Sequence, residues 1–319
     1  MTTGDRRQRL HKLRNVLHSV LLVLGMALIA AVCAWAIWGW EGVLWAMAAV
    51  AIAMVVTPSI PSGLVLSLYR AQPVARHEFP EGYALLDALS RRAGLPGVPR
   101  LHYVPSAVAN AFAVGNRRDA AIAVSDGMLR TLTERELAGV LAHEISHIVN
   151  NDLWIMNLAD AMSRATAVLS QVGMILLLLN LPLVLAGAVT VPWSLVLVLV
   201  LSPTAMSLLQ LALSRAREYE ADIDAVGLSG DPEGLASALL KLERRQGRIW
   251  ESLLLPGRNV PDPSLLRTHP PTDERVRRLM ALSGERPRRT DDRPGPVVLP
   301  GGYRVVGAAP RWRWPGLWY

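Results

Sequence analysis

Residues 141–147 read LAHEISH, which places His143, Glu144 and His147 in a His-Glu-x-x-His pattern. On an α-helix, side chains four residues apart lie on one face, so the two imidazoles can bind one metal ion at about 2.0–2.1 Å. Glu144 is offset by about 100° and can reach a water beside that ion without binding the ion itself. Zinc lowers the pKa of such a water toward about 7, and a carboxylate can take its proton as the water attacks a carbonyl. The alternative is that both histidines are ordinary surface or core residues with no metal.

A catalytic zinc site also needs a third protein ligand and an open coordination position. Residues 214–222 read SRAREYEAD, and this run provides three carboxylates, Glu218, Glu220 and Asp222. Glu218 and Asp222 are four residues apart, so one can bind the metal while the other orients a ligand histidine. Spacing alone does not choose among the three. The alternative is that these charged residues are only the solvent-exposed start of a helix that follows a membrane span.

The motif is predicted to lie inside a helix that follows a small sheet. Thr133-Glu134-Arg135-Glu136 has the capping-box pattern of a helix start, and apolar residues at helical spacing follow it. Further helices are expected at residues 80–94, 214–229 and 231–246. Alternating apolar residues predict strands at 100–104, 111–114 and 120–124, which we expect to form a small antiparallel sheet.

Long charge-free runs indicate a membrane protein. Half of the residues are hydrophobic (51%) and only 18% are charged. Formally charged residues are absent from 15–40, 42–69 and 165–214. Each of the first two runs exceeds the roughly 20 residues that a spanning helix needs, and the third is long enough for two spans. We therefore predict four spans, and we interpret the first run as an uncleaved anchor, the alternative being a signal peptide.

The placement of basic residues predicts the orientation in the membrane. Five basic residues precede the first span, none lies in the turn at 38–42, and Arg70 and Arg76 follow the second span. The positive-inside rule then places both ends of this hairpin, and the motif, on the cytoplasmic side. Although the net charge is +7, no basic stripe is interleaved with aromatic residues, so we expect no nucleic-acid partner. The single cysteine, Cys33, excludes an internal disulfide.

Three separated segments resemble the signature segments of the HtpX-type membrane zinc metalloproteases. They are Asn110-Ala111-Phe112-Ala113, residues 137–147 (LAGVLAHEISH) and residues 214–222 (SRAREYEAD). Their order is also similar, with one membrane hairpin before the domain and another between His147 and the third segment. The resemblance covers about residues 15–283.

The resemblance implies a gluzincin-type endopeptidase that binds one Zn²⁺ ion per chain. By motif position, the zinc ligands would be His143, His147 and Glu218. Glu144 would be the general base, and Asp222 would be the carboxylate that supports the ligands from behind.

The resemblance also implies two elements that act on the substrate. Asn110, Ala111, Phe112 and Ala113 would form a strand at the edge of the cleft, where substrate backbone can add as a further strand. The alternative is an ordinary core strand. His269, which precedes two prolines, would donate a hydrogen bond to the tetrahedral oxyanion. Its alternative role is to cap the helix that follows.

Together these features predict an α+β chain, a polytopic α-helical membrane protein with a gluzincin-type metalloprotease domain made of helices plus a small antiparallel sheet. Residues 1–70 would form an N-terminal transmembrane hairpin. Residues 71–284 would form the metalloprotease domain, interrupted by a second hairpin at about 165–213. Residues 285–319, rich in Arg, Pro and Trp, are expected to be a disordered tail.

The expected function is zinc-dependent cleavage of unfolded or misassembled membrane proteins in quality control. The partners would be unfolded or misfolded protein substrates and membrane lipid, and the location would be the bacterial inner membrane with the active site facing the cytoplasm. One alternative is a catalytically inactive zinc-binding chaperone or adaptor, against which an intact Glu144 argues. Another is a membrane scaffold in which the motif is coincidental.

Overall fold

The computed structural model describes residues 3–56, 62–188, 190–253, 272–283, 312–313 and 317–318. The chain divides into two compact units. We call Met1–Ser59 with Trp154–Ala216 the helical unit, and Ile60–Leu153 with Arg217–Tyr319 the sheet unit. The chain therefore leaves the sheet unit after the motif and returns to it just before Glu218.

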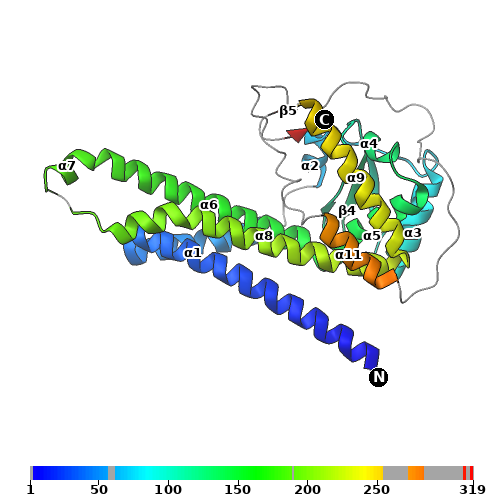
Figure 1. Cartoon of the computed structure of the whole chain (residues 1–319), viewed down its shortest axis with the longest axis horizontal. Coiled ribbons are helices and arrows are strands. Elements are labelled where there is room, and N and C mark those ends of the chain that lie inside the picture. Colours follow the sequence, from blue (N-terminus) through cyan, green and yellow to red (C-terminus); the bar gives the residue numbers. More distant parts are fainter. Residues whose placement is uncertain are drawn as a thin grey trace. The chain divides into compact units, whose positions relative to one another are not determined.

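The helical unit consists of long apolar helices that run alongside one another (Figure 1). They are α1 (Thr3–Val56), α6 (Asp152–Leu179), the short α7 (Leu181–Leu185) and α8 (Trp193–Ser229). Their shared core contains Met26, Leu158, Met162 and Met206, all nearly inaccessible to solvent. Outside this core, large apolar side chains such as Trp45 are exposed, and a lipid environment would cover this surface.

Three described helices are long and apolar enough to cross a membrane: Leu17–Ile52, Asp152–Leu179 and Trp193–Ser229. The first is interrupted at Gly39, whose φ of 62° and ψ of −144° are not helical. Gly39 lies inside the segment 38–42 where we expected a turn between two spans. The number of four spans stays a prediction.

The helices of the sheet unit are α2 (Ser62–Leu68), α3 (Pro80–Ala93), α4 (Asp126–Leu129), α5 (Glu134–Asn150), α9 (Pro232–Leu253) and α11 (Thr272–Ser283). Of these, α3, α5 and α9 begin where the sequence signals predict, whereas no separate helix was predicted at α2, α4 or α11. The capping box of α5 is formed, because Thr133 Oγ1 accepts a bond from Glu136 N while the Glu136 carboxylate accepts one from Thr133 N. The helix expected at 214–229 is the last part of α8, which continues from the apolar segment through Pro203; no Pro or Gly lies between Pro203 and Ser214.

A four-stranded sheet has the order β1-β2-β4-β3. Its strands are β1 (Gln72–Pro73), β2 (Arg100–Val104), β3 (Ala111–Gly115) and β4 (Ala120–Ser125). The predicted three strands form, but the sheet is mixed because β2 and β4 are parallel. The wholly antiparallel arrangement was therefore wrong. After β2 the chain crosses to the far edge of the sheet and forms β3 there. It then turns back as β4, which fills the place between β2 and β3 and runs parallel to β2.

The two faces of the sheet are covered by different helices. On one face the main core joins the sheet to α3, α5, α9 and α11, with Leu137, Leu141 and Ile145 of α5 fully buried. On the other face a small cluster joins the sheet to Leu66 of α2. The apolar side of the motif helix is thus fixed against the sheet, which leaves its histidine-bearing side to face α8.

Most of the predicted tail at 285–319 lies outside the described residues. The described part consists of two short antiparallel strands, β5 (Trp312–Arg313) and β6 (Leu317–Trp318). The expectation of a disordered tail stays a prediction.

Candidate metal centre

His143 and His147 lie one helical turn apart on α5 with their Nε2 atoms 3.1 Å apart. Their rings meet edge to face, with centroids 4.7 Å apart. His143 is buried and His147 is partly exposed. Two imidazole nitrogens at this separation are close enough to bind one ion.

Glu218 brings a carboxylate from α8 to the same point. Its Oε2 atom lies 3.4 Å from His143 Nε2, and its Oε1 atom lies 3.7 Å from His147 Nε2. Ligand atoms that surround zinc tetrahedrally at about 2.0–2.1 Å are about 3.3–3.4 Å apart. The three observed separations bracket this value, so His143, His147 and Glu218 can hold one ion of this size.

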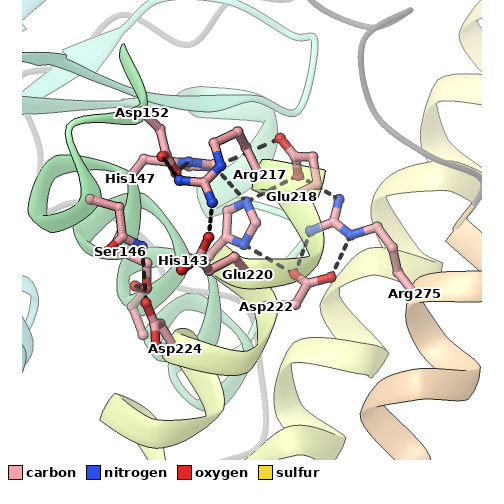
Figure 2. Close-up of polar contacts among 12 residues, drawn as sticks. His143, Ser146, His147, Asp152, Arg217, Glu218, Glu220, Asp222, Asp224 and Arg275 are labelled. Carbon is pink, nitrogen blue, oxygen red and sulfur yellow. Dashed lines mark hydrogen bonds and ion pairs between the residues drawn. The ribbon is translucent and has the colours of Figure 1, made fainter. Parts of the chain in front are cut away.

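A carboxylate and an arginine lie behind His143 (Figure 2). His143 Nδ1 is 3.1 Å from Asp222 Oδ1, on the side of the ring away from Glu218. Arg275 of α11 binds Asp222 with two hydrogen bonds, from Nε at 2.7 Å and from Nη2 at 2.6 Å. Its Nη1 atom also lies 3.3 Å from Glu218 Oε2. Arg275 therefore fixes both the predicted third ligand and the carboxylate behind the first.

His147 has an equivalent pair of supporting residues. Its Nδ1 atom is 2.8 Å from Oδ2 of Asp152, a carboxylate that is almost completely buried. Arg217 Nη1 donates to the other oxygen of Asp152 at 3.0 Å, and Arg217 also forms an ion pair with Glu220. Each histidine is thus backed by an aspartate, and each aspartate is backed by an arginine.

The three carboxylates that spacing left open have different neighbours in the structure. Glu218 faces the Nε2 atoms of both histidines, Asp222 faces Nδ1 of His143, and Glu220 pairs with Arg217. The positions of Glu218 and Asp222 agree with those that the resemblance implied.

Sequence reasoning missed Asp152, Arg217 and Arg275. Asp152 begins α6 directly after Asn151, whose left-handed backbone (φ 55°) ends α5 and turns the chain back toward His147. An acidic residue that opens the helix after the motif was the available signal. For Arg275, the signal was an arginine at the start of an amphipathic helix, although its partner could not be known before the fold.

The electrostatics of the centre favour a cation. Burial by itself lowers the pKa of His143, but the neighbouring carboxylates of Asp222 and Glu218 outweigh it and raise this pKa to about 10. Burial also lowers the pKa of the Arg275 guanidinium, and Asp222, Glu218 and Glu144 together raise it above its usual value. Glu144 is therefore near this group of charges, on a partly exposed position of α5.

The predicted substrate strand corresponds to Asn110 and the first residues of β3 (Ala111–Gly115). β3 is an edge strand of the sheet, and α5 packs against it. An edge position is compatible with a substrate-binding strand, but Ala113 and Val114 are buried as in an ordinary core strand, so the substrate role stays a prediction. His269, the predicted oxyanion donor, lies outside the described residues.

Comparisons with known proteins agree on one family. A family model described as Peptidase family M48 matches residues 77–283. Several proteins described as "Protease HtpX homolog" are similar to the chain. That of Paraburkholderia phytofirmans is 35% identical over 233 residues, covering 69% of this chain and 80% of its own length. That of Pyrococcus abyssi is 36% identical over 253 residues, covering 70% and 80%. That of Thermococcus kodakarensis is 38% identical over 254 residues, again covering 70% and 80%.

One solved structure, titled "Crystal Structure of S. mikatae Ste24p", is also similar. It aligns with 84% of this chain and 66% of its own, at 18% identity and a TM-score of 0.45.

Proposed function

The chain belongs to peptidase family M48, among its HtpX-type membrane metalloproteases, and we propose that it is a zinc-dependent endopeptidase that cleaves unfolded or misassembled proteins. The observation that carries the proposal is the set of separations among the donor atoms of His143, His147 and Glu218, which are 3.1, 3.4 and 3.7 Å.

Zinc is the metal that this set of donors fits. Two histidines and one carboxylate, with a fourth position left for water or substrate, form a common arrangement of catalytic zinc. Softer metals favour thiolates and harder ones favour oxygen alone, so these donors suit an intermediate first-row ion such as zinc or iron(II), and membership in a peptidase family favours zinc. We therefore propose one Zn²⁺ ion per chain, bound by His143, His147 and Glu218.

Glu144 is the proposed general base. Zinc bound at this site would polarise a water and the substrate carbonyl, which makes attack possible near neutral pH. Glu144 follows His143 on α5, so its carboxylate is offset from the ligands and can accept the proton of the attacking water. It can then deliver this proton to the nitrogen of the departing amine.

Asp222 and Asp152 hold the two imidazoles in the productive tautomer. A carboxylate beside Nδ1 keeps the ring proton there, which leaves the lone pair of Nε2 directed at the ion. His269 remains our proposed donor to the oxyanion, on the basis of the family resemblance alone.

The proposed substrates are extended segments of other proteins. β3 has an unpaired edge among the described residues, and an extended chain can add there through backbone hydrogen bonds. Backbone pairing depends little on sequence, which suits a protease that acts on many unfolded chains. The apolar helices and the basic residues that flank them support an inner-membrane location with the active site on the cytoplasmic side.

A comparison of wild type, Glu144→Gln and His143→Ala tests the proposal. Each protein is purified in detergent with a chelator, reloaded with zinc, analysed for bound metal and incubated with an unfolded protein substrate. We expect wild type to bind one zinc and to cleave. Glu144→Gln should bind zinc normally but lose about 10²- to 10⁴-fold in rate, because the ligands remain while the base is lost. His143→Ala should lose both properties.

Other outcomes point to other functions. Equal cleavage by wild type and Glu144→Gln would exclude Glu144 as the base. Zinc binding without cleavage by wild type would favour the chaperone or adaptor, and absence of zinc binding would favour the scaffold.

A further inference from the structure

Backbone hydrogen bonds identify which groups of β3 face its open edge. Ser125 N donates to Asn110 O, and Asn116 N donates to Asp119 O, at the two ends of the β3–β4 ladder. In an antiparallel pair the bonded residues alternate. Residues 110, 112, 114 and 116 therefore direct their backbone groups toward β4. Ala111 and Ala113 direct theirs toward the open edge, where an added strand would bond.

Side chains of β3 alternate between the two faces of the sheet. Ala111 and Ala113 contribute to the main core on the α5 side. Phe112 lies on the opposite face, in the small cluster with Leu66 of α2. The face on the α5 side therefore offers only methyl groups near the edge, and the opposite face offers an aromatic ring.

The Phe112 ring packs against a second aromatic ring at the same edge. Its centroid is 4.7 Å from that of Tyr69, which directly follows α2, and the two rings are inclined by 45°. Both side chains remain partly exposed. The cluster on this face contains small and apolar residues, including Ala121, Ala123 and Val114. Tyr69 and Phe112 thus form an accessible apolar surface beside the open backbone of β3.

We propose that Tyr69 and Phe112 form a subsite that selects one large apolar side chain in an extended substrate. This inference rests on the proposed function of β3 as a substrate-binding edge. If the added strand is antiparallel, its residue opposite Phe112 occupies a non-hydrogen-bonded pair, where side chains approach most closely. That side chain points to the same face as Phe112 and contacts the two rings, whereas its neighbours point toward the alanine face.

The chemistry of this surface defines the substrate class. An aromatic or branched apolar side chain gains contact area on the two rings, whereas a carboxylate would lose water and be repelled by the ring faces, with the Tyr69 hydroxyl as its one donor among the two residues. Unfolded membrane proteins are rich in large apolar residues, so a single apolar subsite would select such segments while the backbone pairing accepts varied sequences elsewhere.

Peptide binding to the Glu144→Gln protein tests the subsite without requiring hydrolysis. The full-length, zinc-loaded protein in detergent is titrated with fluorescent extended peptides in which each position in turn is Phe, Ala or Asp. We expect one position at which Phe binds about fivefold more tightly than Ala, and Asp more weakly than Ala. In the Phe112→Ala background, the ratio between Phe and Ala should fall to about one.

A charge introduced at the subsite distinguishes direct contact from a folding defect. Phe112→Arg, made in the same background, should favour Asp over Phe at that one peptide position, because a cross-strand pair of opposite charges is then possible. A protein that is merely damaged cannot reverse a preference. Leu64→Ser, which changes an exposed leucine of α2, is the matched control and should keep the wild-type preference.

The results separate this inference from the proposed function. Position-specific preference that disappears in Phe112→Ala supports the subsite even if wild type proves not to hydrolyse these peptides. Equal binding of the Phe, Ala and Asp peptides at every position overturns it, and so does a uniform loss of affinity in both Phe112 variants, even if wild type cleaves efficiently.

Discussion

Asp152→Asn should weaken zinc binding although Asp152 is not one of the proposed ligands. Asp152 is 1% exposed, and its two oxygens contact His147 Nδ1 at 2.8 Å and Arg217 Nη1 at 3.0 Å. Asparagine has the same shape, so the substitution removes the negative charge with little change in packing. The imidazole then loses the charged acceptor that fixes its tautomer and raises its basicity.

The expected magnitude follows from the kind of contact that is lost. A carboxylate behind a ligand histidine typically contributes 10- to 100-fold to metal affinity, or about 1.4–2.7 kcal/mol. The net contribution of a hydrogen bond to a charged group, about 1.5–3 kcal/mol, lies in the same range. We therefore expect the zinc dissociation constant of Asp152→Asn to rise by about 10- to 100-fold.

Competition with a zinc-binding dye measures this dissociation constant in detergent solution. Asp126→Asn is the matched control, because Asp126 is also a buried aspartate held by an arginine, with Arg130 Nε at 2.7 Å, and it also accepts a bond from Tyr103. It should lose stability but keep its zinc affinity. A change of less than twofold in Asp152→Asn, or an equal loss in both variants, would refute the reasoning.

Two further substitutions test buried polar contacts, one beside the centre and one at the start of α5. Arg275→Met leaves the buried Asp222 without the two hydrogen bonds from Arg275, so thermal unfolding should show that the free energy of unfolding falls by about 3–5 kcal/mol. Glu136→Gln should lower the free energy of unfolding by about 1–3 kcal/mol at pH 7, measured by denaturant unfolding, because Lys241 and Ser237 both bond the carboxylate. Burial raises the pKa of Glu136, but the bonds from Lys241 and Ser237 outweigh burial and hold this pKa below its usual value. The stabilisation from these bonds is therefore complete above about pH 4.5 and is lost as the pH falls through the lowered pKa.

The control for Arg275→Met lies on the same helix, and the control for Glu136→Gln is its pH dependence. Arg278 of α11 is largely exposed, pairs with Glu274 and stacks on the ring of Tyr219. Arg278→Met should therefore lower the free energy of unfolding by only about 1 kcal/mol. A similar cost for Arg275→Met would contradict the role given to its buried pair. For Glu136→Gln, the difference from wild type must shrink in acid. A difference that is constant from neutral to acid pH would show that the charge of Glu136 is not responsible.

The sequence predicted the parts of the centre that lie on one helix or follow a local signal. Thr133 and Glu136 form the capping box from which α5 starts, and His143 and His147 meet because helical spacing places them on one face. Pattern could not choose among Glu218, Glu220 and Asp222, because that choice depends on how α8 is rotated about its axis relative to α5. The family resemblance supplied the choice before the fold was known.

The missed residues depend on tertiary contacts that pattern does not encode. Arg275 reaches Asp222 across 53 residues of chain, and Arg217 reaches Asp152 across 65. The parallel pairing of β2 with β4 was missed for a similar reason. Alternation predicts that a segment is a strand, but the order of strands depends on where the β3–β4 hairpin packs.

The arrangement of charges explains why the centre needs arginines as well as carboxylates. Without a cation, Glu218, Asp222, Asp152 and Glu220 are buried close together, and their mutual repulsion would favour protonation or opening of the site. Buried guanidinium groups compensate much of this charge without competing for the ion, because arginine stays protonated and cannot bind a metal. Arg275 and Arg217 therefore let the two histidines keep charged acceptors behind them. Both Nε2 atoms can then face the point between the histidines and Glu218 where the proposed ion would bind.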